Sequence, residues 1–159
     1  MKLTIGKGMD ENLTQLGNLE MKSPEAMGKA IYKASGTMYD AIKANIEKMP
    51  VDDRPFSERI TGIRSIQKKG LIESLGIAHA RTDYGYRNTK IGFDGYNRLI
   101  TNEYPYGQPN AMIARTFESG NSFTKKIPFV GPAVRANREK CEAQMKAIID
   151  EEIIKIFSI

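Results

Sequence analysis

A tight turn leads directly into the last long helical pattern of the chain, in the stretch Lys125-Lys126-Ile127-Pro128-Phe129-Val130-Gly131-Pro132-Ala133-Val134. Proline and glycine residues frame its apolar centre, Phe129-Val130. Pro132 is predicted to be the first residue of the helix, where its missing N–H costs no hydrogen bond. Phe129 comes just before that helix, so we expect its ring to be buried and to fix how the helix packs on the fold.

Two long amphipathic helices are predicted from apolar residues spaced three and four positions apart. The later one follows the turn and carries Val134, Cys141, Met145, Ile148, Ile149, Ile153 and Ile156. The earlier one is expected to begin at Ser23-Pro24-Glu25, because serine caps a helix, proline suits its first turn and glutamate meets its positive end. It is expected to end before Pro50.

Short strands are predicted between and before these helices. Residues 77–81 and 89–93 are expected to pair antiparallel around a turn at residues 83–88, and residues 2–5 form a further strand signal. The sequence therefore predicts an α+β fold, with a small antiparallel β-sheet packed against two long amphipathic helices. We expect one domain over residues 1–159. Its long loops exceed what a minimal domain needs, at residues 50–60, 81–88, 96–110 and 118–127.

The composition is that of an ordinary globular protein, with 40% hydrophobic and 27% charged residues among 159. No apolar run is long enough to cross a bilayer. The N-terminal residues lack the apolar core of a secretion signal, so we expect synthesis in a cytoplasm. The single cysteine, Cys141, lies at an apolar helical position and is predicted to be a small core residue rather than a reactive thiol.

The chain is mildly basic, with a net charge of +5 and a pI of about 9.3. Its basic residues are scattered, and the only doublets are Lys68-Lys69 and Lys125-Lys126. A small basic nucleic-acid-binding protein is therefore an alternative interpretation, although an arm that reads DNA usually shows a denser cluster of positive charge.

Motifs for catalysis are missing from the sequence. The only histidine, His79, lies on a predicted strand without a nucleophile motif around it, and no Gly-x-Ser-x-Gly occurs. Asp52-Asp53 can suggest a metal site, but Arg54 follows directly and a solvated turn is the preferred interpretation. We predict a binding or structural protein without a cofactor or metal, and keep a small enzyme using carboxylates as a third hypothesis. The loop tyrosines Tyr96, Tyr104 and Tyr106 are either packing anchors or interface residues.

Three segments together resemble the siphophage neck or tail-completion family, the small head–tail joining proteins of the Hong Kong phage type. They are Leu3-Thr4-Ile5 with Gly8-Met9-Asp10-Glu11 and Leu13; Ala44-Asn45-Ile46 with Met49-Pro50-Val51-Asp52; and Phe117-Glu118-Ser119-Gly120 with Lys126-Ile127-Pro128-Phe129-Val130-Gly131-Pro132-Ala133. The last segment is the most specific. The sequence departs from the family pattern at Asp53 and at Ser119-Gly120, and it carries an apparent insertion over residues 54–69.

The resemblance implies a structural protein of the virion neck or tail, made in the host cytoplasm, and not an enzyme. Such a subunit would form a homo-oligomeric ring on assembly, contact the phage connector and tail proteins, and let DNA pass without reading it. No membrane partner is expected. The residues that carry the resemblance are the candidates for structural or assembly roles, namely Pro50, Asp52, Glu118, Gly120, Pro128, Phe129 and Pro132.

Overall fold

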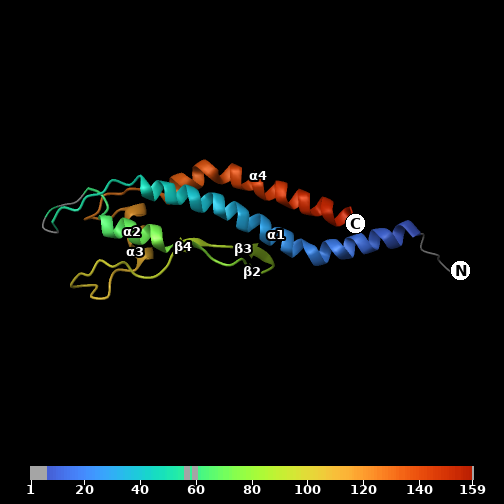
Figure 1. Cartoon of the computed structure of the whole chain (residues 1–159), viewed down its shortest axis with the longest axis horizontal. Coiled ribbons are helices and arrows are strands. Elements are labelled where there is room, and N and C mark those ends of the chain that lie inside the picture. The colour runs from blue at the N-terminus through green and yellow to red at the C-terminus, as the bar shows by residue number, and fades with distance from the viewer. Residues whose placement is uncertain (1–6, 56–57, 59–60, 159) are drawn as a thin grey trace.

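The computed structural model describes residues 7–55, 58 and 61–158. Its elements follow the order α1, α2, β1, β2, β3, β4, α3, α4. Two long helices lie side by side along the molecule, and the shorter elements gather on one side of this pair (Figure 1). The α+β class predicted from the sequence is therefore confirmed, while the strand predicted at residues 2–5 lies outside the described residues.

The long helices α1 (Lys7–Glu47) and α4 (Val130–Phe157) run antiparallel. The Thr37 hydroxyl donates to Gln144 Oε1 at 2.9 Å, and Cys141 Sγ donates to the Ala34 carbonyl oxygen at 3.4 Å. Cys141 is buried, which confirms its assignment to the core. Small side chains let the two helices approach closely, since α1 buries an alanine at every turn over Ala26, Ala30 and Ala34.

The predicted helix start at Ser23-Pro24-Glu25 is wrong, because α1 begins at Lys7 and contains Pro24 in its interior. Proline removes the N–H that would bond the carbonyl of Glu20 four residues earlier. The Ser23 hydroxyl lies 3.5 Å from that carbonyl oxygen and donates to it instead, so the helix continues. Its axis changes direction in the N-terminal part of α1, drawn in blue in Figure 1.

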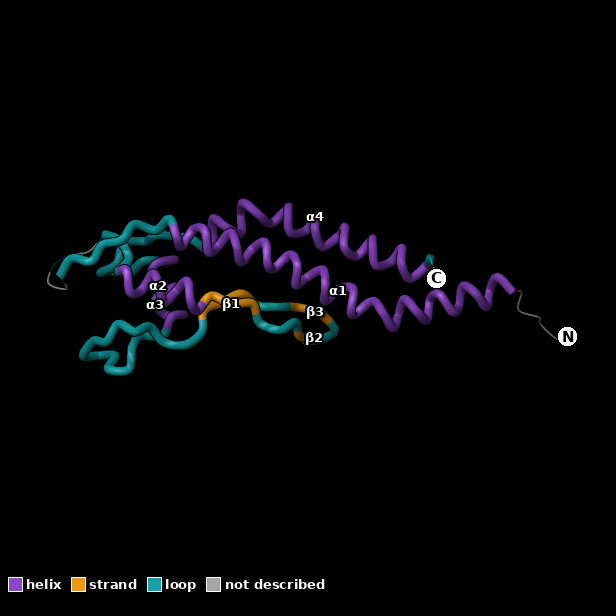
Figure 2. The backbone as a smooth tube through the Cα atoms, viewed as in Figure 1, coloured by secondary structure: helices purple, strands orange, loops and turns teal. Residues whose placement is uncertain are grey.

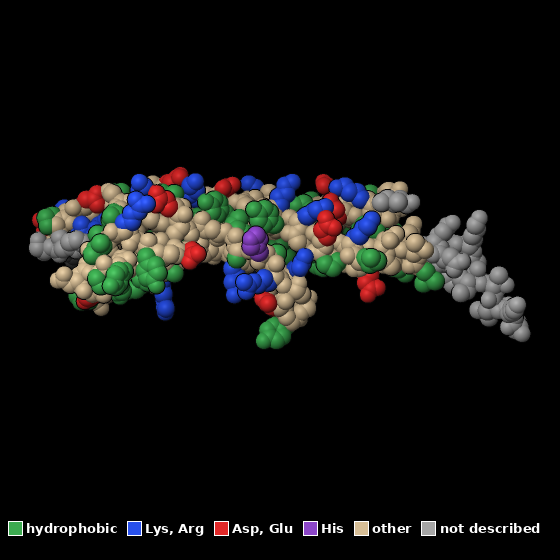
Figure 3. Space-filling view, turned by 60° about the horizontal axis from the view of Figure 1, so that its bottom comes forward, with side chains coloured by type: hydrophobic (Ala, Val, Ile, Leu, Met, Phe, Trp, Pro, Cys, Tyr) green, Lys and Arg blue, Asp and Glu red, His purple; other side chains and the backbone are tan. Residues whose placement is uncertain are grey.

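One long hairpin supplies the strands, which form two separate two-stranded antiparallel sheets (Figure 2). β1 (Leu75–Ile77) pairs with β4 (Ile91–Phe93), and β2 (Arg81–Asp83) pairs with β3 (Tyr86–Asn88). The predicted antiparallel pairing is confirmed, but the strand predicted at residues 77–81 is divided between β1 and β2. His79 lies in the connection between them and is exposed, at the purple position in Figure 3.

The core lies at the end of the molecule where α1 finishes and α4 begins. The short helices α2 (Ser65–Ser74) and α3 (Asn110–Ser119) pack there beside β1 and β4. The ring of Phe129 is fully buried and meets Phe93 edge-on, with centroids 5.9 Å apart. Other core side chains come from every surrounding element and include Ile42, Ile46, Met49, Ile63, Leu71, Leu75, Ile113 and Phe117.

The start of α4 differs from the prediction by two residues. The helix begins at Val130, so Pro132 is its third residue rather than its first. This position still falls within the first turn, where backbone N–H groups have no acceptor inside the helix. Proline is therefore tolerated there for the physical reason that the sequence indicated. The predicted burial of Phe129 directly before the helix is confirmed.

We expect Phe129→Ala to lower the free energy of unfolding by about 3–5 kcal/mol, because it leaves a cavity in a packed core. Phe123→Ala is the matched control, since Phe123 is 83% exposed and its loss should stay within about 0.5 kcal/mol. Urea unfolding followed by circular dichroism measures both. Similar losses for the two variants would show that Phe129 is not a core residue.

Candidate functional site

The seven candidate residues gather at one end of the molecule, where three helices end or begin. α1 finishes before Pro50, α3 finishes before Gly120, and α4 starts after Phe129. The Asn45 side-chain amide of α1 donates to the Phe129 carbonyl oxygen at 2.9 Å and so ties two of these segments together. We call this region the helix-end junction and define it as residues 50–53, 117–120 and 127–132 together with Lys68.

Glu118 is the polar centre of the junction. One carboxylate oxygen accepts hydrogen bonds from the backbone N–H groups of Phe129 and Val130 at 2.8 and 2.9 Å, and the other accepts from Gly131 at 2.8 Å. The first N–H groups of a helix lack partners within it, and the helix dipole favours an anion at this end. A carboxylate from α3 therefore caps α4, eleven residues away along the chain.

Partial burial alone would raise the pKa of Glu118. The three backbone N–H donors outweigh this effect, with a smaller contribution from the positive charge of Lys126, and hold the pKa of Glu118 below its ordinary value. The carboxylate is thus ionised at neutral pH, and its charge stabilises the fold.

Lys68 of α2 caps the C-terminal end of α1 in the same way. Its ammonium group donates to the carbonyl oxygens of Glu47 and Met49 at 2.7 and 3.0 Å. The last carbonyl groups of a helix lack partners, and the dipole favours a cation there. Because α1 and α4 are antiparallel, the positive and negative caps lie at the same end of the molecule.

Asp52 and Asp53 organise the loop that follows α1. The side chain of Arg54 and the backbone N–H of Thr61 donate to Asp52 and hold the pKa of this carboxyl well below its usual range. Asp53 accepts from the backbone N–H of Ser65, the first residue of α2, at 2.8 Å. Within the described part of the chain, no cluster of three or more acidic, histidine or cysteine side chains could hold a metal ion.

The prolines of the candidate set shape the backbone and make few polar contacts. The carbonyl oxygen of Pro50 accepts from the N–H of Ile63 at 2.9 Å, which fastens the loop after α1 to the start of α2. A Cβ atom on Gly62 would lie only 2.3 Å from the same oxygen, so glycine is required there. Pro128 is exposed and Pro132 is half-buried, both beside the capped turn.

Two buried asparagines, which the sequence did not single out, fix the loop between β4 and α3. The side-chain amide of Asn97 lies within 3.3–3.4 Å of the carbonyl oxygens of Ile66 and Gln67 on α2 and of Asn110 Oδ1. Asn110 in turn donates to the carbonyl oxygen of Asp94 at 3.0 Å. No periodic pattern marks these residues, and the nearest sequence signal is the Pro109-Asn110 pair at the start of α3.

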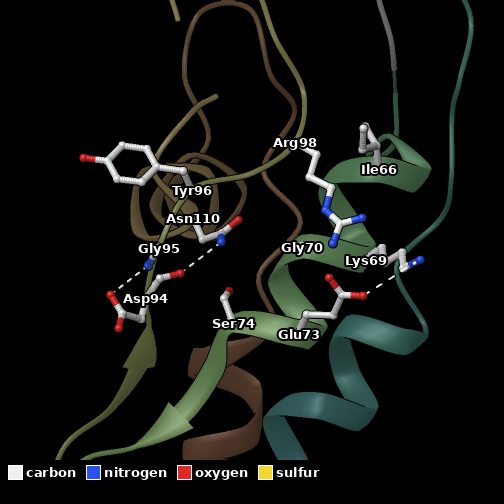
Figure 4. A pocket seen from close by; sticks show the side chains of 10 residues that line it. All are labelled: Ile66, Lys69, Gly70, Glu73, Ser74, Asp94, Gly95, Tyr96, Arg98 and Asn110. Atoms are coloured by element: carbon white, nitrogen blue, oxygen red, sulfur yellow. Dashed lines mark hydrogen bonds and ion pairs between the residues drawn. The ribbon is translucent and has the colours of Figure 1, made fainter. Parts of the chain in front are cut away.

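A polar cleft of about 350 Å³ opens beside Asn110, between α2 and the loop (Figure 4). Its walls carry charges of both signs, from Lys69, Glu73, Asp94 and Arg98. Lys69 and Glu73 form an ion pair at 3.9 Å on one wall, while Asp94 lies across the cleft from them in Figure 4. The hydroxyl of Ser74 also lines the cleft, beside these charged side chains.

The three loop tyrosines differ in their burial. Tyr104 is half-buried and its hydroxyl lies 3.4 Å from Met112 Sδ, so it is an anchor. Tyr96 and Tyr106 are 69% and 92% exposed on a loop that the asparagine pair holds in place. Apolar side chains also gather over this loop in Figure 3, and another projects from the β2–β3 hairpin. Exposed aromatic rings of this kind are enriched at protein interfaces.

We expect Glu118→Gln to lower the free energy of unfolding by about 1–2 kcal/mol at pH 7, since the α4 start loses its charged cap. Because the pKa of Glu118 is lowered in the folded state, its stabilisation is present above the unfolded pKa and is lost as pH falls. The difference between the two proteins should therefore shrink below about pH 4.

Urea unfolding at a series of pH values measures this difference. Glu139→Gln is the control, because Glu139 lies exposed on α4 and should leave stability unchanged. A Glu118→Gln difference that stays constant down to acid pH would contradict the charged cap.

Gly120→Ala is expected to destabilise the fold by about 1–2 kcal/mol. Gly120 has a φ of 73°, and an added Cβ would lie 3.0 Å from Lys126 Cβ and 3.1 Å from its backbone nitrogen. Gly36→Ala is a control of opposite sign, since Gly36 lies inside α1 with free space around it and alanine should stabilise the helix by about 0.5–1 kcal/mol. Thermal unfolding compares them, and equal shifts would refute the strain at Gly120.

Two of the three segments that resemble the head–tail joining family thus meet at the helix-end junction, whereas residues 8–13 of the first segment lie at the opposite end of α1. Comparisons of this chain with protein-family models, with curated proteins and with solved structures found no match. The family indicated by the three segments therefore stays a prediction.

Proposed function

We propose that this protein is a structural subunit of the head–tail junction of a phage virion. Copies of it form a ring that joins the head connector to the tail and lets DNA pass. It acts in the neck or tail of the particle after synthesis in the host cytoplasm, and it performs no catalysis. Its partners are further copies of itself and the connector and tail proteins.

One observation carries this proposal: two of the segments that resemble the head–tail joining family meet in the helix-end junction. Residues 44–52 end α1, and residues 117–133 connect α3 to α4. The Asn45 amide bonds the Phe129 carbonyl oxygen, and the Ile127 N–H donates to the Phe117 carbonyl oxygen at 2.8 Å. A resemblance spread over distant parts of the sequence is more informative when those parts meet, because it then describes one structural unit.

Exposed aromatic side chains support a role in assembly. Five of them lie on the β2–β3 hairpin and on the loops around α3, at Tyr84, Tyr86, Tyr96, Tyr106 and Phe123. Aromatic residues are enriched at the centres of protein interfaces, where they contribute much of the binding energy. Loops held on a rigid core can present such residues in a fixed arrangement.

The distribution of charge supports proximity to DNA rather than sequence recognition. Some basic side chains on the long helices form ion pairs with acidic ones, as Lys29 does with Glu152 and Arg138 with Glu142. Blue and red side chains alternate along the face shown in Figure 3. A weak positive excess attracts phosphates without reading bases. In the described residues, neither long helix contains a stretch apolar enough to cross a bilayer.

Deletion of the gene from the phage or prophage that carries it is expected to leave filled heads and separate tails in electron micrographs. A plasmid copy of the wild-type gene should restore joined particles. Tyr106→Asp should fail to restore them, because it places a charge in the proposed docking surface. Tyr32→Asp is the matched control, since Tyr32 is exposed on α1 and lies outside the loop of residues 96–110, and it should restore joining. Joined, infectious particles from the deletion strain would refute the proposal.

A further inference from the structure

The polar cleft between α2 and the loop after β4 is built on a fixed backbone (Figure 4). Asn97 is 2% exposed, and its side-chain nitrogen donates to two carbonyl oxygens of α2. Its side-chain oxygen accepts from the N–H of Leu99 at 3.0 Å, and its backbone N–H donates to the Gln108 carbonyl oxygen at 2.7 Å. Arg98 therefore extends from a backbone that is held in place beside α2.

Buried hydrogen bonds position both walls of the cleft. A Cβ atom on Gly70 of α2 would lie 2.1 Å from Asn97 Nδ2, so the loop lies directly against the helix backbone. On the opposite wall, Asn110 is 3% exposed, and its side-chain amide and backbone N–H donate to the carbonyl oxygens of Asp94 and Gly95, each at 3.0 Å. Because the chain itself holds these walls, little entropy is lost when a ligand binds between them.

Two groups of opposite charge face the cleft from different elements. The Arg98 side chain extends from the loop toward α2 in Figure 4, and the Glu73 carboxylate of α2 points into the same space. Among the residues that the structure describes, Arg98 forms no ion pair. Glu73 has one long contact, at 3.9 Å from Lys69 Nζ, and both of these side chains are more than half exposed. Such a pair contributes little stability and leaves the Glu73 carboxylate able to bind a ligand.

The balance of charge in the cleft restricts the chemistry of its ligand. The carboxylates of Glu73 and Asp94 disfavour a phosphate-rich molecule, while the guanidinium of Arg98 disfavours a simple cation. A molecule that carries an ammonium and a carboxylate group on one carbon atom satisfies both constraints, because a guanidinium binds a carboxylate through two parallel hydrogen bonds. The volume of the cleft, about 350 Å³, is within the range of small-molecule sites.

We propose that this cleft binds a small amino acid in its zwitterionic form. The Arg98 guanidinium binds the carboxylate of the ligand. The Glu73 carboxylate binds the ammonium group in place of Lys69, and the Ser74 hydroxyl forms a hydrogen bond with a polar ligand side chain. The site shares no residue with the helix-end junction, and it does not depend on the proposed role in the virion.

A chemical-shift titration of the full, isotope-labelled chain tests the site. L-Glutamine is the probe, because its side chain is polar and uncharged, and saturable shifts are expected for the amides of residues 66–74 and 94–98. N-Acetyl-L-glutamine lacks the ammonium group and L-glutaminamide lacks the carboxylate, so each should bind about tenfold more weakly. The absence of saturable shifts with L-glutamine, or equal affinities for the three probes, would overturn the proposal.

Charge-removing variants assign the two groups of the ligand. Arg98→Gln should weaken L-glutamine about tenfold and leave the affinity for L-glutaminamide unchanged, because that probe offers no carboxylate to the guanidinium. Glu73→Gln should weaken L-glutamine and leave the affinity for N-acetyl-L-glutamine unchanged. Arg115→Gln is the matched control, since Arg115 is exposed on α3 and does not line the cleft.

Circular dichroism verifies that each variant keeps its helices. Equal affinities of Arg98→Gln and Arg115→Gln for L-glutamine would refute the role of Arg98. Separated heads and tails in the gene deletion, combined with no binding of L-glutamine, would leave the proposed function standing without this site.

Discussion

The Glu118 carboxylate on the first N–H groups of α4 is the interaction on which the rest of the structure depends. It joins the end of one helix to the start of another and thereby places Phe129 in the core. Lys68 closes the end of α1 beside it with the opposite charge. Each cap satisfies backbone groups that the helix leaves unpaired, and each matches the sign of the helix dipole. The antiparallel arrangement of α1 and α4 brings both caps to one end, where the core is also concentrated.

Much of this fold could be predicted from local patterns. Apolar spacing identified both long helices, alternation and turn residues identified the hairpin, and the position of Phe129 before a proline-containing helix identified a core residue. Pro24 was misread because its local signals suit a helix start, while the packing of the α4 end beside Ser23 and Ala26 extends the helix through it. Propensity is a weak guide where tertiary contacts decide the outcome.

The polar connections of the candidate site could be predicted only in part. Glu118 was predicted only as part of a motif. Its three backbone donors lie eleven to thirteen residues away along the chain, and residue spacing does not predict such contacts. Asn97 and Asn110 have no periodic signal, because a buried amide is recognised only once its partners on α2 and α3 are known. These contacts give the exposed tyrosines of the neighbouring loop a fixed frame, which is what a docking surface needs to limit the entropy lost on binding.

Because both helix caps lie at one end of the molecule, the helix-end junction is expected to be more stable against local unfolding than the N-terminal end of α1. Amide protons near the helix-end junction are expected to exchange with solvent only through global unfolding, whereas those of the N-terminal turns of α1 can exchange through fraying. The contacts that stabilise the fold are thus concentrated at the helix-end junction, and the N-terminal turns of α1 contribute little to the free energy of unfolding. Ordering or fraying of the N-terminal turns of α1 therefore leaves the packed core at the helix-end junction intact.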